Sequence, residues 1–397
     1  MTTKNNLFIS VLVIAAIALG NAGSTLYLPA MPVITSSLHT TGQMMKLSLS
    51  LFLISFGASQ LLYGPLSDAF GRKINLIFGL VIFIVGSVIS AFAESISVLL
   101  VGRLIEGLGI GAANAVGYAL MRDVYSGSKL TMQLSYISVF VGAMPIIAPI
   151  IGGYLVEEIS WQSCFYLLTI VAVLILILKM IFLPETLAIL DPTARHPIIV
   201  VNRYIILLKS STYMGYALIA AVAFGAIFTM GSTLPFLLVN QLGVSIKFCG
   251  WIAGIPALGY LSGSFLSGRL SNNISLPRLI LFGSIFGSCS MAIGLLVNML
   301  VVKFTLYTLI TPLICLMFGV GFLVPTASSG AMAPFPKLAG SESALLCALM
   351  FCFASILTAI GSHLKIITPA PLFALLGMVC VLALLFLFIA KHGEKND

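Results

Sequence analysis

Long apolar runs, separated by short polar intervals, make up almost the whole chain. A helix needs roughly 20 apolar residues to cross the hydrocarbon core of a bilayer. A helix also satisfies its own backbone hydrogen bonds, which lipid cannot do. We therefore predict an all-α polytopic membrane protein with about twelve transmembrane helices. They are expected near residues 7–29, 45–66, 74–93, 97–121, 131–155, 162–183, 212–239, 247–268, 278–299, 303–325, 342–363 and 370–390.

The composition agrees with a membrane protein. Of the 397 residues 60% are hydrophobic and 8% are charged, and the mean hydropathy is +1.17. A soluble protein of this length could not bury so much apolar surface. The seven cysteines are scattered through apolar segments without the spacing of a metal site, and no disulfide is expected. The run after Asn6 is long enough to span, so we interpret it as a helix rather than a cleaved signal.

Basic residues predict the orientation of the helices, because cytoplasmic loops carry an excess of Lys and Arg. With the N-terminus inside, the loops on the same side hold Arg72, Lys73, Arg122, Lys129, Arg195, Arg203, Lys209, Arg269, Arg278 and Lys337. The lysines at helix edges on the other side are Lys46, Lys247, Lys303 and Lys365. Both termini are therefore expected in the cytoplasm. The net charge of +8 indicates topology, and no clustered bases suggest a nucleic-acid partner.

A polar interval divides the chain into two halves. It covers residues 184–211, which we interpret as a cytoplasmic linker, and separates a six-helix segment, 1–183, from a second one, 212–397. The run Gly23-Ser-Thr-Leu26 recurs as Gly231-Ser-Thr-Leu234 at the corresponding place in the second half. This is either a trace of duplication or a coincidence of a biased composition. Duplication would place Thr25 and Thr233 opposite each other across a cavity.

The predicted helix 97–121 carries two opposite charges. Arg103 and Glu106 are three residues apart and share a helix face. Charges inside a membrane are costly unless they pair or face water. Two interpretations stay open. The two residues form a self-contained ion pair that holds the helix, or Glu106 is a titratable carboxylate near the substrate path that Arg103 tunes.

The run Gly64-Pro-Leu-Ser-Asp-Ala-Phe-Gly-Arg-Lys73 concentrates an acid and two bases in a chain that is otherwise almost uncharged. We interpret it as a cytoplasmic turn in which Gly64 and Gly71 permit a tight backbone and Asp68 accepts from N–H groups at a helix start. A charged turn alone would explain Arg72 and Lys73, but not the ordered spacing. This spacing resembles the loop signature of the major facilitator superfamily.

Prolines and glycines mark the predicted helix 131–155. Pro145 and Pro149 remove backbone donors, and the pair Gly152 and Gly153 lets a neighbouring helix approach closely. The pattern predicts a kinked, tightly packed helix. It also resembles the antiporter motif of drug exporters in the superfamily, in which this helix packs at the interface of the two halves.

Stretches similar to the Bcr/CflA branch of drug/proton antiporters occur in order along essentially the whole chain. They are Ser24-Thr-Leu-Tyr-Leu-Pro-Ala-Met-Pro32, Gln60-Leu-Leu-Tyr-Gly-Pro-Leu-Ser-Asp68, Arg122-Asp123, Ala148-Pro-Ile-Ile-Gly-Gly153 and Pro334-Phe-Pro-Lys-Leu-Ala-Gly-Ser-Glu-Ser-Ala344. The resemblance implies the major facilitator fold, two pseudo-symmetric six-helix bundles in the inner membrane. It implies a monomeric, proton-coupled exporter of small organic molecules that works by alternating access without a cofactor. The residues of its expected conformational latch are Gly64, Asp68, Gly71, Arg72 and Lys73.

One departure from that branch concerns charge. The branch usually has an Asp in the first helix where this chain has Thr25, and a hydroxyl cannot carry a proton. Lys46 stands where the branch tends to have Gln. Two bases, Lys46 and Arg103, against one acid, Glu106, give the interior of the first half a net charge of +1. This sign suits an anionic substrate such as a polycarboxylate siderophore, which is the alternative to multidrug efflux, unless Lys46 snorkels to the outer interface.

Glu106 first, and Asp123 second, are the acids expected to carry protons. The side chains expected to line the substrate cavity are Asn21, Thr25, Tyr27, Lys46, Arg103, Asn114, Tyr118, Thr229, Thr233 and Tyr260. The chain has no phosphate-binding Gly-rich loop followed by Lys-Ser/Thr, so ATP is not expected as the energy source. A membrane-embedded enzyme or a receptor is a further hypothesis, but no catalytic dyad or metal cluster supports it, and we predict that the protein is not an enzyme.

Overall fold

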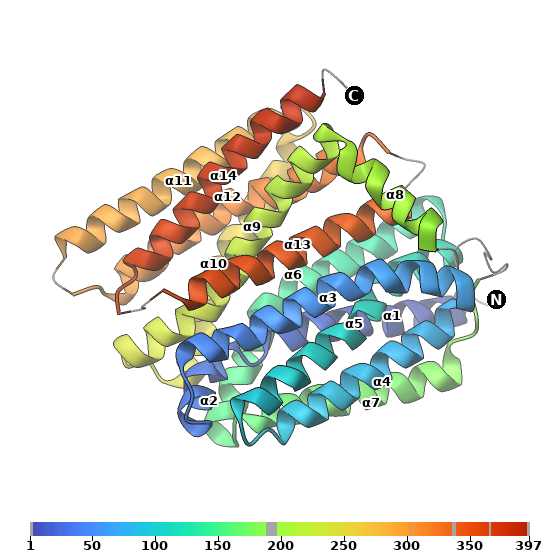
Figure 1. Ribbon diagram of the computed structural model, residues 1–397, viewed down its shortest axis with the longest axis horizontal. Coiled ribbons are helices and arrows are strands. Elements are labelled where there is room, and N and C mark those ends of the chain that lie inside the picture. The colour runs from blue at the N-terminus through green and yellow to red at the C-terminus, as the bar shows by residue number, and fades with distance from the viewer. Residues whose placement is uncertain (1–2, 188–196, 302, 336–338, 365–366, 395–397) are drawn as a thin grey trace.

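The computed structural model describes residues 3–187, 197–301, 303–335, 339–364 and 367–394, and in these ranges every regular element is a helix (Figure 1). The elements are α1 Thr3–Thr25, η1 Leu28–Ala30, α2 Met31–Ser37, α3 Gly42–Phe70, α4 Arg72–Ala91, α5 Ile96–Val124, α6 Gly127–Glu158, α7 Gln162–Phe182, α8 Pro197–Lys209, α9 Ser211–Phe236, η3 Leu237–Gln241, α10 Ile246–Leu270, α11 Leu276–Leu300, α12 Leu306–Met332, α13 Ala339–Ser362 and α14 Ala370–Gly393. Within the described ranges twelve spans are long and apolar enough to cross a bilayer, which confirms the predicted number. We call the end of the bundle where α1 begins and α14 ends the terminal end, and the opposite end, which carries α2, the far end (Figure 1).

The first span is broken near the far end. α1 ends at Thr25, the 3-10 turn η1 follows, and α2 continues to Ser37, so the span ends later than residue 29, where the sequence predicted its end. Pro29 and Pro32 have no backbone N–H to donate. Each proline lies in the first two residues of its short element, where that missing donor matters least.

The turn between the second and third spans is shorter than the sequence predicted. α3 stays helical through Phe70 and α4 begins at Arg72, so Gly71 alone joins them. Its φ of +99° is a conformation that glycine adopts easily and other residues rarely adopt. Gly64 lies inside α3, and no other group is within 4 Å of the place where its Cβ would be. Of the two glycines expected to permit the turn, only Gly71 does so.

The interval 184–211 contains a helix, α8, which the sequence interpretation treated only as a polar linker. The hydroxyl of Tyr204 donates to the carbonyl of Leu61 at 3.2 Å and so ties α8 to α3. Burial raises the pKa of Tyr204 to about 12, so this hydroxyl keeps its proton at neutral pH. Some of the basic residues used to predict the orientation lie outside the described residues: Arg195, Lys337 and Lys365.

The buried apolar core has a part in each half. One cluster is formed by residues from Leu207 to Ala390, and two others are formed mainly by residues from Ile9 to Leu183. One of these two also contains Phe228, Phe236 and Phe351 of the second half, so the division of the chain near residues 184–211 stays a prediction. Two long helix pairs join the halves, because α3 lies along α13 and α6 lies along α10 (Figure 1).

The pair α3 and α13 is held by hydrogen bonds and aromatic contact. Ser50 Oγ donates to the carbonyl of Ser355 at 2.6 Å, and Ser355 Oγ donates to the carbonyl of Ser50 at 2.8 Å. The rings of Phe56 and Phe351 follow, with centroids 4.3 Å apart. These residues were not singled out in the sequence, since nothing in either helix alone shows which partner it meets.

Candidate functional site

Arg103 and Glu106 form an ion pair on α5, and both side chains are 0% exposed. Ser87 of α4 donates its hydroxyl to Glu106 Oε1 at 2.6 Å. Arg103 Nη2 donates to the backbone carbonyl of Gly23 in the first span at 2.9 Å. A buried ion pair with additional hydrogen bonds is tolerated, whereas either charge alone would be very costly. One pair of charges therefore links α1, α4 and α5.

Aromatic rings enclose the guanidinium of Arg103. Its Cζ lies 4.3 Å from the ring centroid of Tyr27 and 4.2 Å from that of Phe52, within the range of a cation–π interaction. The hydroxyls of Tyr27 and Ser48 are 3.1 Å apart. All of these partners belong to the first half, so Arg103 and Tyr27 face its interior here. Their part in a substrate cavity between the halves stays a prediction.

Arg72 is the centre of a second charged cluster, at the terminal end. Its Nη1 lies 2.6 Å from Asp68 Oδ1, and its Nε lies 3.0 Å from Asp123 Oδ2. The same Nη1 donates to Ser67 Oγ at 2.6 Å. These bonds join α3, α4 and α5. Asp123, expected as the second proton carrier, is held in this cluster, about 25 Å along α5 from Glu106 at ~1.5 Å rise per residue.

Glu185 adds a carboxylate to the cluster around Arg72, and the sequence interpretation missed it. Its carboxylate accepts the backbone N–H of Arg72 at 3.0 Å and that of Lys73 at 3.1 Å. These are amides of the first turn of α4, which have no partner within the helix and attract an anion. Asp68 was expected in this role but pairs with Arg72 instead. The sequence alone gave no signal for this contact, because Glu185 lies 113 residues after Arg72.

The antiporter-like residues of α6 are Pro145, Pro149, Gly152 and Gly153. A Cβ on Gly152 would lie 1.8 Å from the carbonyl oxygen of Leu26, at the break in the first span. A Cβ on Gly153 would lie 2.8 Å from a carbonyl at the start of α10, and one on Gly250 of α10 would lie 2.2 Å from the carbonyl of Pro149. Only residues without a side chain allow such close approach. These contacts place α6 between the first span and α10, at the interface of the halves.

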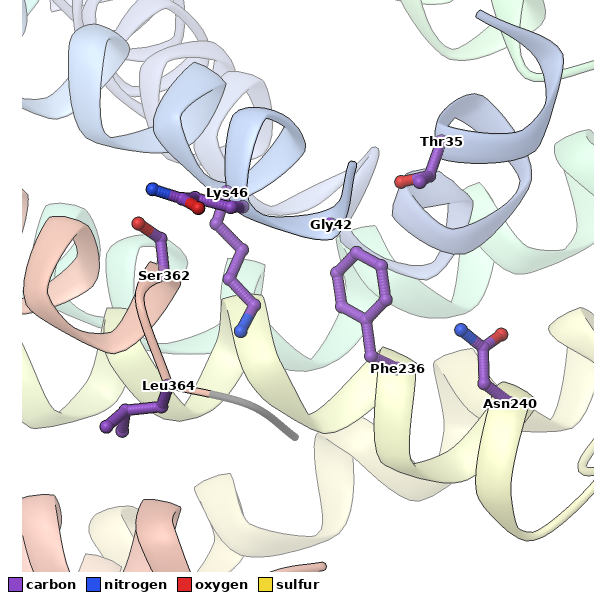
Figure 2. A pocket seen from close by; sticks show the side chains of 8 residues that line it. Thr35, Gly42, Lys46, Phe236, Asn240, Ser362 and Leu364 are labelled. Atoms are coloured by element: carbon purple, nitrogen blue, oxygen red, sulfur yellow. The ribbon is translucent and has the colours of Figure 1, made fainter. Parts of the chain in front are cut away.

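Lys46 lies at the far end, between the two halves, beside a cavity of about 230 Å³ (Figure 2). Figure 2 shows its side chain extended from α3 toward the second half. The residue is 2% exposed, its Nζ lies 3.3 Å from the carbonyl of Gly361, and it lies 5.5 Å from the ring centroid of Phe236. The alternative in which Lys46 snorkels to the outer interface is therefore wrong.

The remaining cavity candidates are spread over four helices of both halves: Asn21 and Thr25 on α1, Asn114 and Tyr118 on α5, Thr229 and Thr233 on α9, and Tyr260 on α10. Asn21 and Thr25 donate to backbone carbonyls of their own helix. Asn114 Oδ1, Thr229 Oγ1 and Thr233 Oγ1 are buried oxygens without a hydrogen-bond partner. Such unpaired groups are unusual in a folded interior, and a bound ligand or water would satisfy them. No contact brings all seven together in this conformation.

The order of the helices, the charged cluster around Arg72 and the close contacts of α6 agree with the family that the sequence resembles. The model of the Major Facilitator Superfamily matches residues 12–346, which is most of the chain. The chain belongs to the Major Facilitator Superfamily. The xylose transporter XylE of E. coli, in a partially occluded inward open conformation, has the same fold, with a TM-score of 0.73, 14% sequence identity, and coverage of 97% of this chain and 98% of that chain.

Relatives within the family point to the expected branch. The chain is 26% identical to multidrug resistance protein D of Escherichia coli over 92% of its own length and 91% of that protein. It is 25% identical to a bicyclomycin resistance protein homolog of Haemophilus influenzae over 100% of both chains. These relatives confirm the resemblance to the Bcr/CflA branch. The protein is therefore a multi-pass transporter of the inner membrane, and members of its family move small molecules rather than catalyse reactions.

Proposed function

We propose that the protein exports chemically diverse small organic molecules in exchange for protons, by alternating access. Its similarity to resistance proteins extends over nearly the whole chain, which supports efflux of this kind. The observation that carries the proton coupling is the complete burial of Glu106 beside Arg103. Protonation of Glu106 would leave a buried cation without its counter-ion and would change the bonds to Ser87 and Gly23. Proton uptake would thereby be coupled to a rearrangement of three helices.

The proposal includes a topology and a cycle. Both termini lie in the cytoplasm, the monomer consists of bundles 1–183 and 212–397, and the linker 184–211 is cytoplasmic. In that orientation the latch around Arg72 faces the cytoplasm, and the contacts of Lys46 and of Ser50 with Ser355 close the outer side. Export requires the halves to rock apart along α3 and α13 on the outer side while the substrate stays near the midplane.

Everted membrane vesicles with an imposed pH gradient test this function. Lipophilic cations and polycarboxylates are added in separate experiments, and dissipation of the pH gradient is recorded. We expect the cations to dissipate the gradient and Glu106→Gln to abolish the pH dependence of transport. Glu94→Gln removes an exposed acid and serves as the control. Coupling that is unaltered in Glu106→Gln would reject the role of this carboxylate.

The relatives do not favour the alternative, transport of an anionic metabolite such as a siderophore. The same vesicles decide between the two functions. A gradient that responds to polycarboxylates and not to cations would replace multidrug efflux with anion transport.

A further inference from the structure

The cavity at the far end is built from elements that are distant in sequence. Thr35 of α2, Gln43 and Lys46 of α3, Phe236 of α9, Asn240 of η3 and Ser362 of α13 surround about 230 Å³ (Figure 2). This volume exceeds the ~10–15 Å³ that one water needs by more than an order of magnitude. The cavity is therefore large enough for a small organic molecule.

Lys46 places an unmatched charge on this cavity. An ammonium group has three N–H donors, and the carbonyl of Gly361, at 3.3 Å, is the one acceptor that the structure gives it. Among the residues that the structure describes, Lys46 belongs to no ion pair. Buried charges are normally paired, so a lysine that is 2% exposed and has unused donors beside a cavity favours an anionic ligand there.

The other side chains that line the cavity indicate the chemical class of the anion. Asn240 carries an amide with two donors, and Gln43 keeps one N–H free, because its Nε2 contacts His363 Nδ1 at 2.9 Å. The ring of Phe236 lies beside Asn240 on the same wall (Figure 2) and packs against Gly42, where a Cβ would lie 3.3 Å from the ring. Several donors together with an apolar ring in one cavity fit a carboxylate attached to a flat or aliphatic body better than a bare inorganic ion.

We propose that this cavity binds a small organic monocarboxylate, with its carboxylate on Lys46 and its hydrocarbon part against Phe236. The bound carboxylate replaces the carbonyl of Gly361 as the principal partner of Lys46. Because the bond from Lys46 to Gly361 joins α3 to α13, the ligand changes one of the contacts that close the far end. The site does not depend on which molecule is exported, since none of the groups around Arg103 and Glu106 takes part in it.

Ligand-observed fluorine NMR on the purified full-length protein in detergent tests the site. The probe is fluorobenzoate, and the neutral isostere fluorobenzamide is measured beside it. We expect fluorobenzoate to bind the parent protein and Lys46→Arg, and to bind Lys46→Gln at least about tenfold more weakly, because charge-assisted hydrogen bonds are lost. Lys303→Gln makes the same charge change at an exposed position and should bind like the parent.

Three results would overturn the proposal: no binding of fluorobenzoate to the parent protein, equal binding to Lys46→Gln, or equal binding of fluorobenzamide. The elution profile of each variant on size-exclusion chromatography shows whether it is folded. If Lys46→Gln does not fold, Lys46→Arg still tests the proposal. The assay measures binding without transport. Its failure would therefore leave the proton-coupled efflux untouched, and failure of the vesicle assay would leave this site untouched.

Discussion

Neutralising one member of the pair Arg103 and Glu106 should destabilise the protein far more than removing both charges. Glu106→Gln leaves the guanidinium of Arg103 buried at 0% exposure without its counter-ion. Breaking a buried pair in this way costs about 3–5 kcal/mol. In Arg103→Met/Glu106→Gln no charge is left to solvate. The Met side chain has a comparable length and packs well between the rings of Tyr27 and Phe52. We expect the double variant to lose only about 1–2 kcal/mol, mainly because the carbonyl of Gly23 loses its donor.

Thermal unfolding of the purified variants in detergent measures the difference. For a chain of this length about 1 kcal/mol corresponds to roughly 1–2 °C, so Glu106→Gln should lower the Tm by about 5 °C and the double variant by much less. The control removes the exposed pair of Lys247 and Glu158, whose Nζ and Oε1 are 3.3 Å apart, and should change the Tm little. If the double variant unfolds at the same temperature as Glu106→Gln, an orphaned Arg103 is not the cause of the loss, and the reasoning fails.

Two glycine substitutions test the close contacts of the spans. Gly71→Ala should slow transport and lower stability by about 1 kcal/mol or more, because φ is +99° and the new Cβ would lie 2.6 Å from Glu185 Oε2. Transport in vesicles and the Tm measure this effect. A variant with unchanged transport and Tm would contradict the tight turn. Gly152→Ala should prevent stable insertion or folding, since its Cβ would lie 1.8 Å from the carbonyl of Leu26, whereas Gly64→Ala meets nothing within 4 Å and should be neutral or stabilising. Expression level and size-exclusion profile separate the two, and equal behaviour would refute the contact.

The sequence predicted those features that depend on one segment at a time. Hydropathy is summed along one helix at a time. It therefore located the twelve spans but not their ends, as the break in the first span near Pro29 shows. The pairing of Arg103 with Glu106 follows from a spacing of three residues on one helix. The partner of the first amides of α4 could not be found in this way, because Glu185 lies 113 residues after Arg72 and chemistry alone made Asp68 an equally good acceptor.

The same limit explains Lys46. Seen from α3 alone, a lysine near a helix end is expected to snorkel to the interface. Its burial depends on α9 and α13 of the other half, and Gly361, the residue that accepts its hydrogen bond, is 315 positions away. The reciprocal bonds between Ser50 and Ser355 are hidden for the same reason, because a serine in an apolar helix normally bonds back to its own backbone.

The first span has Thr25 where an acid was expected, and the bonds of Arg103 show how the acid of α5 is connected to this span. Residue 25 has no carboxylate, but Arg103 donates a hydrogen bond to the backbone carbonyl of Gly23, two residues earlier in the same span. The charge state of Glu106 therefore reaches the first span through Arg103 even though the acid belongs to α5. A neutral Glu106 no longer neutralises Arg103, and the carbonyl of Gly23 stays as a backbone acceptor for that cation, close to the break between α1 and η1. In the proposed function, the ion pair that stabilises the fold is thus also the route by which protonation of Glu106 would move the first span.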